Sequence, residues 1–268
     1  MTDKDRDGEA ASPPEHSTNG YAKGCLTTFV LAAAIIALGL WALSGDKRTL
    51  RSRLTLVVET PEGDRSGSSV SQVTILSPGP CNRAIGFGSL GIEGEEGEAV
   101  VIDLGARGIL FATLAREKDR RSGGLGMYDA GLAPFPREKF RGEIGKGLCS
   151  EDEYAAYLDE VQRRKPRGDL AFKHLPILVR FQDTNDPSSV EQVDPFDLAK
   201  SFGQDVRLKQ AFVEITDDPL TKEIQSRLPW LTTDPRLRLI PRQGLYTLAE
   251  SSTIELLEYD DFRTEWHR

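Results

Sequence analysis

Five acidic side chains lie between residues 183 and 197, where carboxylates could bind a metal ion or act as a general acid and base. A calcium-binding EF-hand loop that began at Asp183 would need glycine at its sixth position and glutamate at its twelfth, and Ser188 and Asp194 stand there instead. Asp186 and Asp194 each precede a proline, which is typical of turns and helix starts. The pattern therefore favours caps and turns, and a hydrolase that uses the carboxylates of Asp183–Asp197 is the alternative.

The glycines of residues 86–91 match the pattern GxGxxG. In a nucleotide-binding protein this pattern follows a strand and opens a helix whose N-terminus binds phosphate. Residues 92–98 contain two glycines and four glutamates, which would break a helix and repel phosphate. We therefore predict a flexible glycine loop and no cofactor.

Histidine and cysteine are scarce, with three residues of each type. No cysteine has CxxC spacing or a recognisable histidine partner, so we predict no metal site. Cys81 and Cys149 can form a disulfide if the domain lies in an oxidising compartment, and are free thiols otherwise.

A stretch rich in glycine and basic residues, 115–148, shows no sustained periodicity. Structureless segments of this length in compact domains are usually functional or disordered, so we predict a flexible surface loop. If the loop binds a partner, its arginines and lysines make the contact. These residues are Arg116, Lys118, Arg120, Arg121, Arg137, Lys139 and Arg141.

Residues 24–45 contain no charged side chain. As a helix this segment would be about 33 Å long, which matches a bilayer core of about 30 Å. Trp41 stands near one end, where an indole can lie among the lipid headgroups. We predict a single transmembrane helix with the lipid bilayer as its partner, and a secretory signal cleaved after Ser44 is the alternative.

The flanks of this segment differ in charge. Residues 1–23 are polar and acidic, which predicts a disordered tail. Residues 46–53 form a basic collar of Lys47, Arg48, Arg51 and Arg53, which serves as a stop-transfer flank or contacts anionic lipid. By the positive-inside rule this collar would place the domain in the cytoplasm, but long domains are exported largely regardless of flanking charge. We favour the periplasmic side of a bacterial inner membrane.

The remaining residues, 46–268, predict one α+β domain with a mostly antiparallel sheet and about three packed helices. Alternating or short apolar runs predict strands at 53–59, 68–76, 99–104, 109–114, 174–181, 206–215, 237–240, 245–248 and 253–257. A capping-box pattern at 150–153 and the Asp-Pro pairs at 194–195 and 218–219 predict the helix starts. The last two helices should end near Phe202 and Leu228.

Several stretches of this domain resemble a family of uncharacterised single-pass membrane proteins of alphaproteobacteria. They are residues 54–63 with 66–70, residues 99–105, and residues 193–203 continued by 213–219 and 228–230. The resemblance implies a bacterial membrane protein with a dedicated domain. The family has no assigned activity, so the resemblance transfers no site residue.

The net charge of −8 argues against a nucleic-acid partner, because binding to phosphate needs a basic face. With no catalytic pattern, the sequence predicts a membrane-anchored, non-enzymatic domain that binds another component of the cell envelope. It does not indicate the identity of the partner or the oligomeric state.

Overall fold

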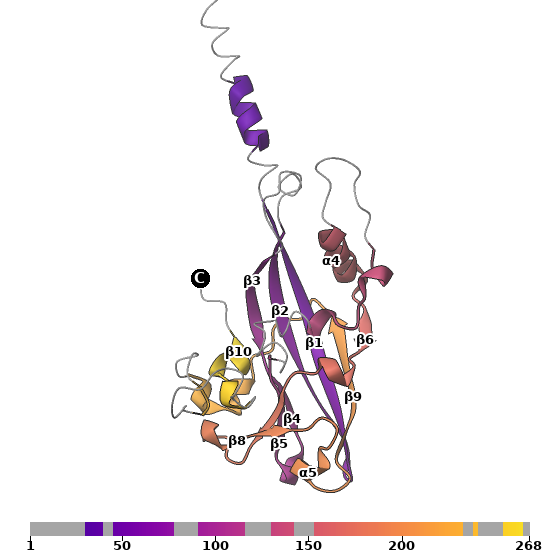
Figure 1. The fold of residues 1–268 in the computed structure, drawn as a ribbon, viewed down its shortest axis with the longest axis vertical. Helices are drawn as coiled ribbons and strands as arrows, with labels where there is room; N and C mark the ends of the chain where they lie inside the picture. Colours follow the sequence, from indigo (N-terminus) through magenta and orange to yellow (C-terminus); the bar gives the residue numbers. More distant parts are fainter. Residues whose placement is uncertain are drawn as a thin grey trace, which may run out of the picture.

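The computed structural model describes residues 30–39, 45–77, 91–115, 130–141, 153–232, 238–240 and 254–264. These residues form two antiparallel sheets with few helices (Figure 1). The larger sheet has the strand order β10-β3-β2-β1-β9-β6, and the smaller has the order β4-β5-β7-β8. The prediction of an α+β domain with mostly antiparallel strands is confirmed at this level.

The bounds of the larger sheet's strands are β1 (Asp46–Thr60), β2 (Gly63–Ser77), β3 (Gly91–Glu98), β6 (Arg167–Asp169), β9 (Arg207–Ile215) and β10 (Arg263–Thr264). Those of the smaller sheet are β4 (Val100–Asp103), β5 (Ile109–Ala112), β7 (Leu178–Phe181) and β8 (Val190–Val193). Two helices pack among them, α4 (Glu153–Arg164) and the short α5 (Ala199–Phe202).

The hairpin of β1 and β2 forms the long axis of the domain (Figure 1). Its register runs without interruption from Thr60 opposite Gly63 to Asp46 opposite Ser77. The tight turn between the strands is completed by Gly63, whose φ of 113° favours glycine. Leu50, Leu56 and Val58 alternate toward the core, so the period-2 pattern of the sequence places one face of β1 inward.

Two structures cover this inward face at different heights. The smaller sheet packs beneath the hairpin end, where Ile102, Leu110 and Leu178 join Leu56 in one core. Near the start of β1, α4 contributes Tyr157, Leu158 and Val161 to the same core. In Figure 1, α4 accordingly lies beside the upper part of the larger sheet and β4, β5 and β8 lie below it.

The smaller sheet has a second core on its other face. Phe111, Val179 and Phe181 point there, opposite to their neighbours Leu110 and Leu178. The C-terminal part covers this face with four 3₁₀ turns, η5 (Ile224–Ser226), η6 (Pro229–Thr232), η7 (Ile254–Leu256) and η8 (Tyr259–Asp261). The ring of Trp230 lies 5.6 Å from Phe181 and 4.8 Å from Tyr259, between ring centroids. The domain is therefore built of three layers.

Several predicted elements are corrected by the structure. The helix expected from Pro219 to Leu228 is wrong, because residues 216–223 have no regular secondary structure and only the 3₁₀ turn η5 forms before Leu228. Asp194 starts a turn, and the helix begins later, at Ala199. The strand expected at 253–257 is the 3₁₀ turn η7, and that at 237–240 contributes only a bridge of Arg238 to Glu258. Residues 150–152 and 245–248 lie outside the described residues.

The structure also contains strands where the sequence predicted none. No strand was predicted after the glycine pattern, but residues Gly91–Glu98 form β3 and pair with β2. This strand has glycines and glutamates instead of an apolar alternation, so pairing with β2, and not burial of large side chains, fixes its conformation. The short strands β6 and β8 were also missed.

The predicted membrane segment is described only in part. Residues 30–39 are helical, and Val30, Leu31, Ile35, Ile36 and Leu38 are between 62% and 66% exposed. Among the described residues no helix is both long and apolar enough to cross a membrane. Residues 1–29 and 40–44 lie outside the described part.

Candidate functional site

Strand β2 loses its outer neighbour partway along its length. β3 pairs with β2 only from Gln72 to Leu76, and after Glu98 the chain turns into β4, which packs across β2. The crossing is close, because a Cβ at Gly67 would lie 2.1 Å from the carbonyl oxygen of Val101. Residues 64–68 of β2 therefore have a strand, β1, on one side only within the described part of the chain.

Residues 216–223, which we call the strap, cross the solvent side of the larger sheet from β9 to β2. The Thr216 amide donates to the carbonyl of Arg51 (3.1 Å), and Asp218 forms an ion pair with Arg53. Together with this guanidinium, the hydroxyl of Thr216 holds the pKa of Asp218 below its ordinary value. At the far end Thr221 Oγ1 accepts the amide of Val70 at 2.9 Å.

Glu98 joins the strap to the sheet. Its side chain is buried, and its two carboxylate oxygens accept the amides of Glu223 (2.7 Å) and Ile224 (3.2 Å). Its backbone oxygen accepts the hydroxyl of Ser69 at 2.7 Å. One residue thus fixes the end of β3, the middle of β2 and the start of η5.

A groove of about 710 Å³ lies between residues 64–68 of β2, residues 99–103 around β4, and residues 221–227. Beyond Thr221 a smaller hollow of about 200 Å³ reaches the start of β10 and shares Glu98, Thr221 and Lys222 with the groove. The larger volume falls in the range of small-ligand sites, about 300–1,000 Å³. The groove is mostly polar, unlike a typical small-molecule pocket, so a polypeptide is the better match.

The hydrogen bonds of Val70 show which backbone amides and carbonyls of β2 point into the groove. Its amide and carbonyl bond to Thr221 instead of β1. Because these directions alternate along a strand, the amides and carbonyls of Ser66 and Ser68 also point away from β1. On that side neither serine has a hydrogen bond to another described residue. The groove therefore offers an open strand edge, which can pair with an extended peptide.

The charges that line the groove differ in how they are used. Asp64 pairs with Lys209 at 2.6 Å, and Asp103 accepts the amide of Gly105 and lies 3.4 Å from Arg227. In contrast, Arg65 and Lys222 are exposed and have no ion pair among the described residues. Electrostatically, the groove holds uncommitted positive charge next to an open backbone edge.

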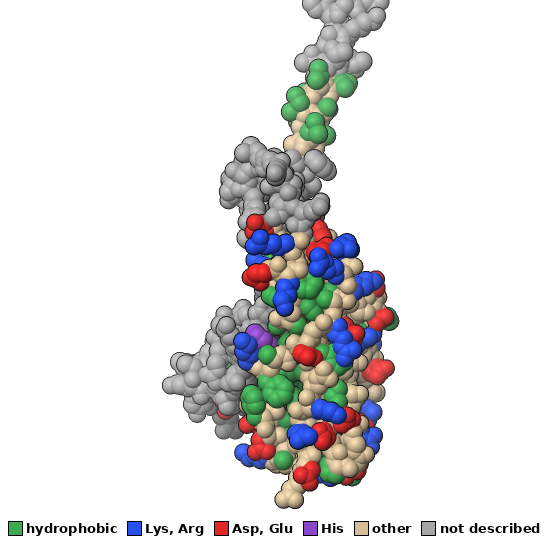
Figure 2. Space-filling model, turned by 90° about the vertical axis from the view of Figure 1, so that its right-hand side faces the viewer, with side chains coloured by type: hydrophobic (Ala, Val, Ile, Leu, Met, Phe, Trp, Pro, Cys, Tyr) green, Lys and Arg blue, Asp and Glu red, His purple; other side chains and the backbone are tan. Residues whose placement is uncertain are grey.

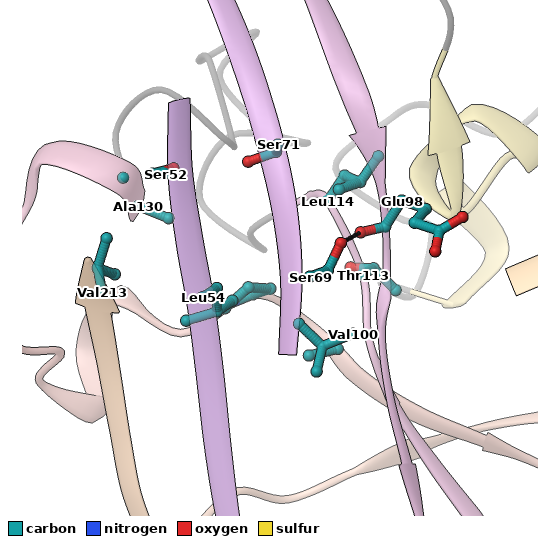
Figure 3. Close-up of a pocket in the computed structure, with 13 residues that line it drawn as sticks. Ser52, Leu54, Ser69, Ser71, Glu98, Val100, Thr113, Leu114, Ala130 and Val213 are labelled. Atoms are coloured by element: carbon teal, nitrogen blue, oxygen red, sulfur yellow. Dashed lines mark hydrogen bonds between the residues drawn. The ribbon is translucent and has the colours of Figure 1, made fainter. Parts of the chain in front are cut away.

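A second, much smaller cavity lies inside the domain (Figure 3). Its volume is about 30 Å³, and its polar wall is formed by Ser52, Ser69, Ser71 and Thr113. This volume has room for one or two water molecules. The carboxylate of Glu98 points away from the cavity toward η5 (Figure 3). The cavity is therefore too small to serve as a ligand pocket.

The acidic cluster of 183–197 is used for local turns. The side chains of Asp183, Asp186 and Asp194 each accept the backbone amide two residues ahead, at 2.9 Å. Asp197 accepts the amide of Lys200 at 3.3 Å. The interpretation as caps and turns is confirmed, and none of these aspartates lines the groove. Within the described part of the chain no three His, Cys, Asp or Glu side chains are placed to hold a metal ion.

Three of the seven predicted partner-binding residues are described. Arg137 lies over the ring of Tyr154 at 4.1 Å, while Lys139 and Arg141 are exposed. They lie beside α4 and do not line the groove. Within the predicted loop the side chain of Phe135 is buried in the core. Arg116, Lys118, Arg120 and Arg121 lie outside the described residues, as do residues 86–90 of the glycine pattern and all three cysteines.

The basic collar belongs to β1 and is bound by the domain itself. Lys47 pairs with Glu93, Arg48 forms a two-point contact with Asp159, and Arg53 pairs with Asp218. On the face that carries α4, β6 and β9, Lys and Arg are interspersed with Asp and Glu (Figure 2). Three of the four collar cations are therefore already paired with acidic side chains of the domain.

No family model, curated protein or solved structure matches this chain. The site is therefore assigned from its geometry, in which the open edge of β2 is the most distinctive feature.

Proposed function

We propose that this chain is a single-pass protein of the bacterial inner membrane whose periplasmic, non-enzymatic domain binds an extended segment of another envelope protein at the edge of β2. The uncharged segment 24–45 and the exposed apolar side chains of residues 30–39 support the anchor. The resemblance to alphaproteobacterial single-pass proteins agrees with it.

The open edge of β2 carries the binding proposal. Ser66 and Ser68 each present one amide and one carbonyl to the groove, and the groove is large enough to admit a peptide backbone. A strand added there would lie beside β2 on the side opposite β1, in the position that β3 occupies farther along β2. Main-chain hydrogen bonds supply affinity in this mode, and side chains in neighbouring pockets supply specificity.

The hairpin also sets the distance between the groove and the anchor. Thr55 and Val57 lie opposite Ser68 and Ser66. With a strand rise of 3.3 Å per residue, they stand roughly 30–36 Å along β1 from Asp46. If Asp46 emerges at the membrane surface, the partner is bound well away from the lipid headgroups.

Photo-crosslinking in cells tests the edge as a contact. A photoreactive phenylalanine analogue at Ser68 should give one defined adduct, whereas the analogue at Gln192, exposed on β8, should not. Adding Ser66→Pro should abolish the adduct, because proline removes the outward amide and leaves the ladder to β1 intact. Adding Ser66→Ala should preserve it. An adduct that survives Ser66→Pro would contradict strand addition.

Paired reporters fused after Arg268, one active in the periplasm and one in the cytoplasm, test the anchor separately. A periplasmic signal is expected. A cytoplasmic signal would overturn the proposed orientation and move the search for a partner to the cytosol.

A further inference from the structure

We infer that the groove selects an extended peptide that carries carboxylate side chains. This inference rests on the proposed function, because it specifies the chemistry of the segment that would pair with β2. Two sets of charged side chains line the groove. One set is already paired within the domain, and the other is left to contact a ligand.

Three acids of the groove are already satisfied within the domain. Asp64 is paired with Lys209, and Glu98 is buried with two backbone amides. Asp103 accepts the Gly105 amide and lies near Arg227. A basic ligand would have to compete with these contacts for every one of the three carboxylates.

The two cations Arg65 and Lys222 have no such partner among the described residues. Glu223 is an uncommitted acid of the same lining, so the charge left for a ligand remains net positive. Carboxylate is the group that guanidinium and ammonium side chains bind best, and arginine can hold it with two hydrogen bonds.

The positions of the two cations fit one extended segment. Arg65 stands near the hairpin turn, and Lys222 follows Thr221, which bonds to Val70. The five steps of strand from 65 to 70 span roughly 16 Å. An extended peptide of about five residues would cover that length while pairing with Ser66 and Ser68. Its acidic side chains would meet one cation near each end.

A peptide selection tests both levels of the proposal. The full chain, held in nanodiscs of uncharged phosphatidylcholine, is panned against a random library of displayed 12-residue peptides. Binders are then sorted by loss of binding to a Ser66→Pro/Ser68→Pro variant, with Ser66→Ala/Ser68→Ala as the matched control. Circular dichroism of each variant verifies that the sheets remain folded.

We expect the edge-dependent binders to be enriched in Asp and Glu. Each exposed ion pair contributes up to about fivefold in affinity, so Arg65→Glu/Lys222→Glu should weaken a chosen acidic binder at least tenfold. Replacing its acids by Gln and Asn should weaken it similarly. Lys200→Glu, on α5 and outside the groove, should leave the affinity unchanged.

The outcomes separate the two levels. Edge-dependent binders that are neutral or basic, or that are insensitive to Arg65→Glu/Lys222→Glu, would overturn the acidic preference and leave strand addition in place. A library that yields no binder able to distinguish the wild type from the proline variant would overturn both.

Discussion

At the scale of single residues, Gly67 permits β4 to cross β2. A methyl group there would press against the carbonyl of Val101 and the side chain of Ile102. We expect Gly67→Ala to lower the free energy of unfolding by about 2 kcal/mol, the usual cost of overpacking a core. Denaturant titration followed by tryptophan fluorescence measures this change.

The matched control is Gly91→Ala, since Gly91 also lies in a strand of the larger sheet but has open space around its Cβ position. This control should change stability by less than about 0.5 kcal/mol. Equal effects at the two positions would show that the crossing at Gly67 tolerates a side chain.

Residues that act on near neighbours were predictable from sequence, and residues that act at long range were not. The roles of Asp186 and Asp194 follow from the proline beside each one, because a turn is completed within a few residues. Glu98 instead bonds an amide 125 positions away. It stands in a run of glutamates and glycines, and no local pattern distinguishes the buried one.

At the scale of elements, the strap is held to β2 by Thr221. We expect Thr221→Val to leave the amide of Val70 without its acceptor and to speed hydrogen exchange in the peptide that contains Val70. A lost hydrogen bond of this kind costs about 1 kcal/mol, or about fivefold in the exchange protection of that peptide. Hydrogen-exchange mass spectrometry of the full chain measures the effect.

Thr55→Val is the control for this change, because Thr55 lies on β1 opposite Ser68 and its hydroxyl has no hydrogen bond to another described residue. If both variants exchange equally fast at Val70, the strap is not held by the Thr221 hydroxyl.

The same segment shows why some elements could not be predicted. Asp218-Pro219 has the pattern of a helix start, but the side chain of Asp218 binds Thr216 and Arg53 instead of capping a helix. That contact depends on the tertiary position of β1. The strands β1, β2, β4 and β5 were predictable because each contains an apolar run or alternation that is visible in the local sequence. One side of the groove is built from elements of the other kind, namely the end of the strap, η5 and the end of β3, while β2 and the residues around β4 form the rest.

At the scale of the whole molecule, stability should fall in acid because several carboxylates have lowered pKa values. Arg107 lowers the pKa of Glu62 to about 2, and Arg163 with Arg164 lowers that of Glu160 to about 2. A carboxylate whose pKa is lower in the folded state stabilises the fold above its unfolded value near 4.5. That contribution should be lost as the pH falls from 4.5 toward 2.

Denaturant titrations at pH 7, 4.5 and 3 measure this acid dependence. Glu62→Gln/Glu160→Gln should lower stability at pH 7 and reduce the difference between pH 7 and pH 3. The ion pairs are exposed and salt screens such pairs, so high salt should weaken the same dependence. An unchanged pH profile in the double variant would show that other groups govern the acid response.

At alkaline pH the protein should lose stability when the buried phenol of Tyr157, on α4, ionises. Burial raises the pKa of this phenol from 10 to about 12, and its hydroxyl donates to the carbonyl of Phe135 at 2.7 Å. Because the folded state holds the proton more tightly, this stabilisation is complete below pH 10 and is lost as the pH rises from 10 through 12. Tyr157→Phe should cost about 1 kcal/mol at neutral pH and flatten the alkaline part of the stability curve. If Tyr157→Phe loses as much stability between pH 10 and 12 as the wild type does, the loss must come from the ionisation of another residue. In that case Tyr157 would hold α4 in place without causing the alkaline loss of stability.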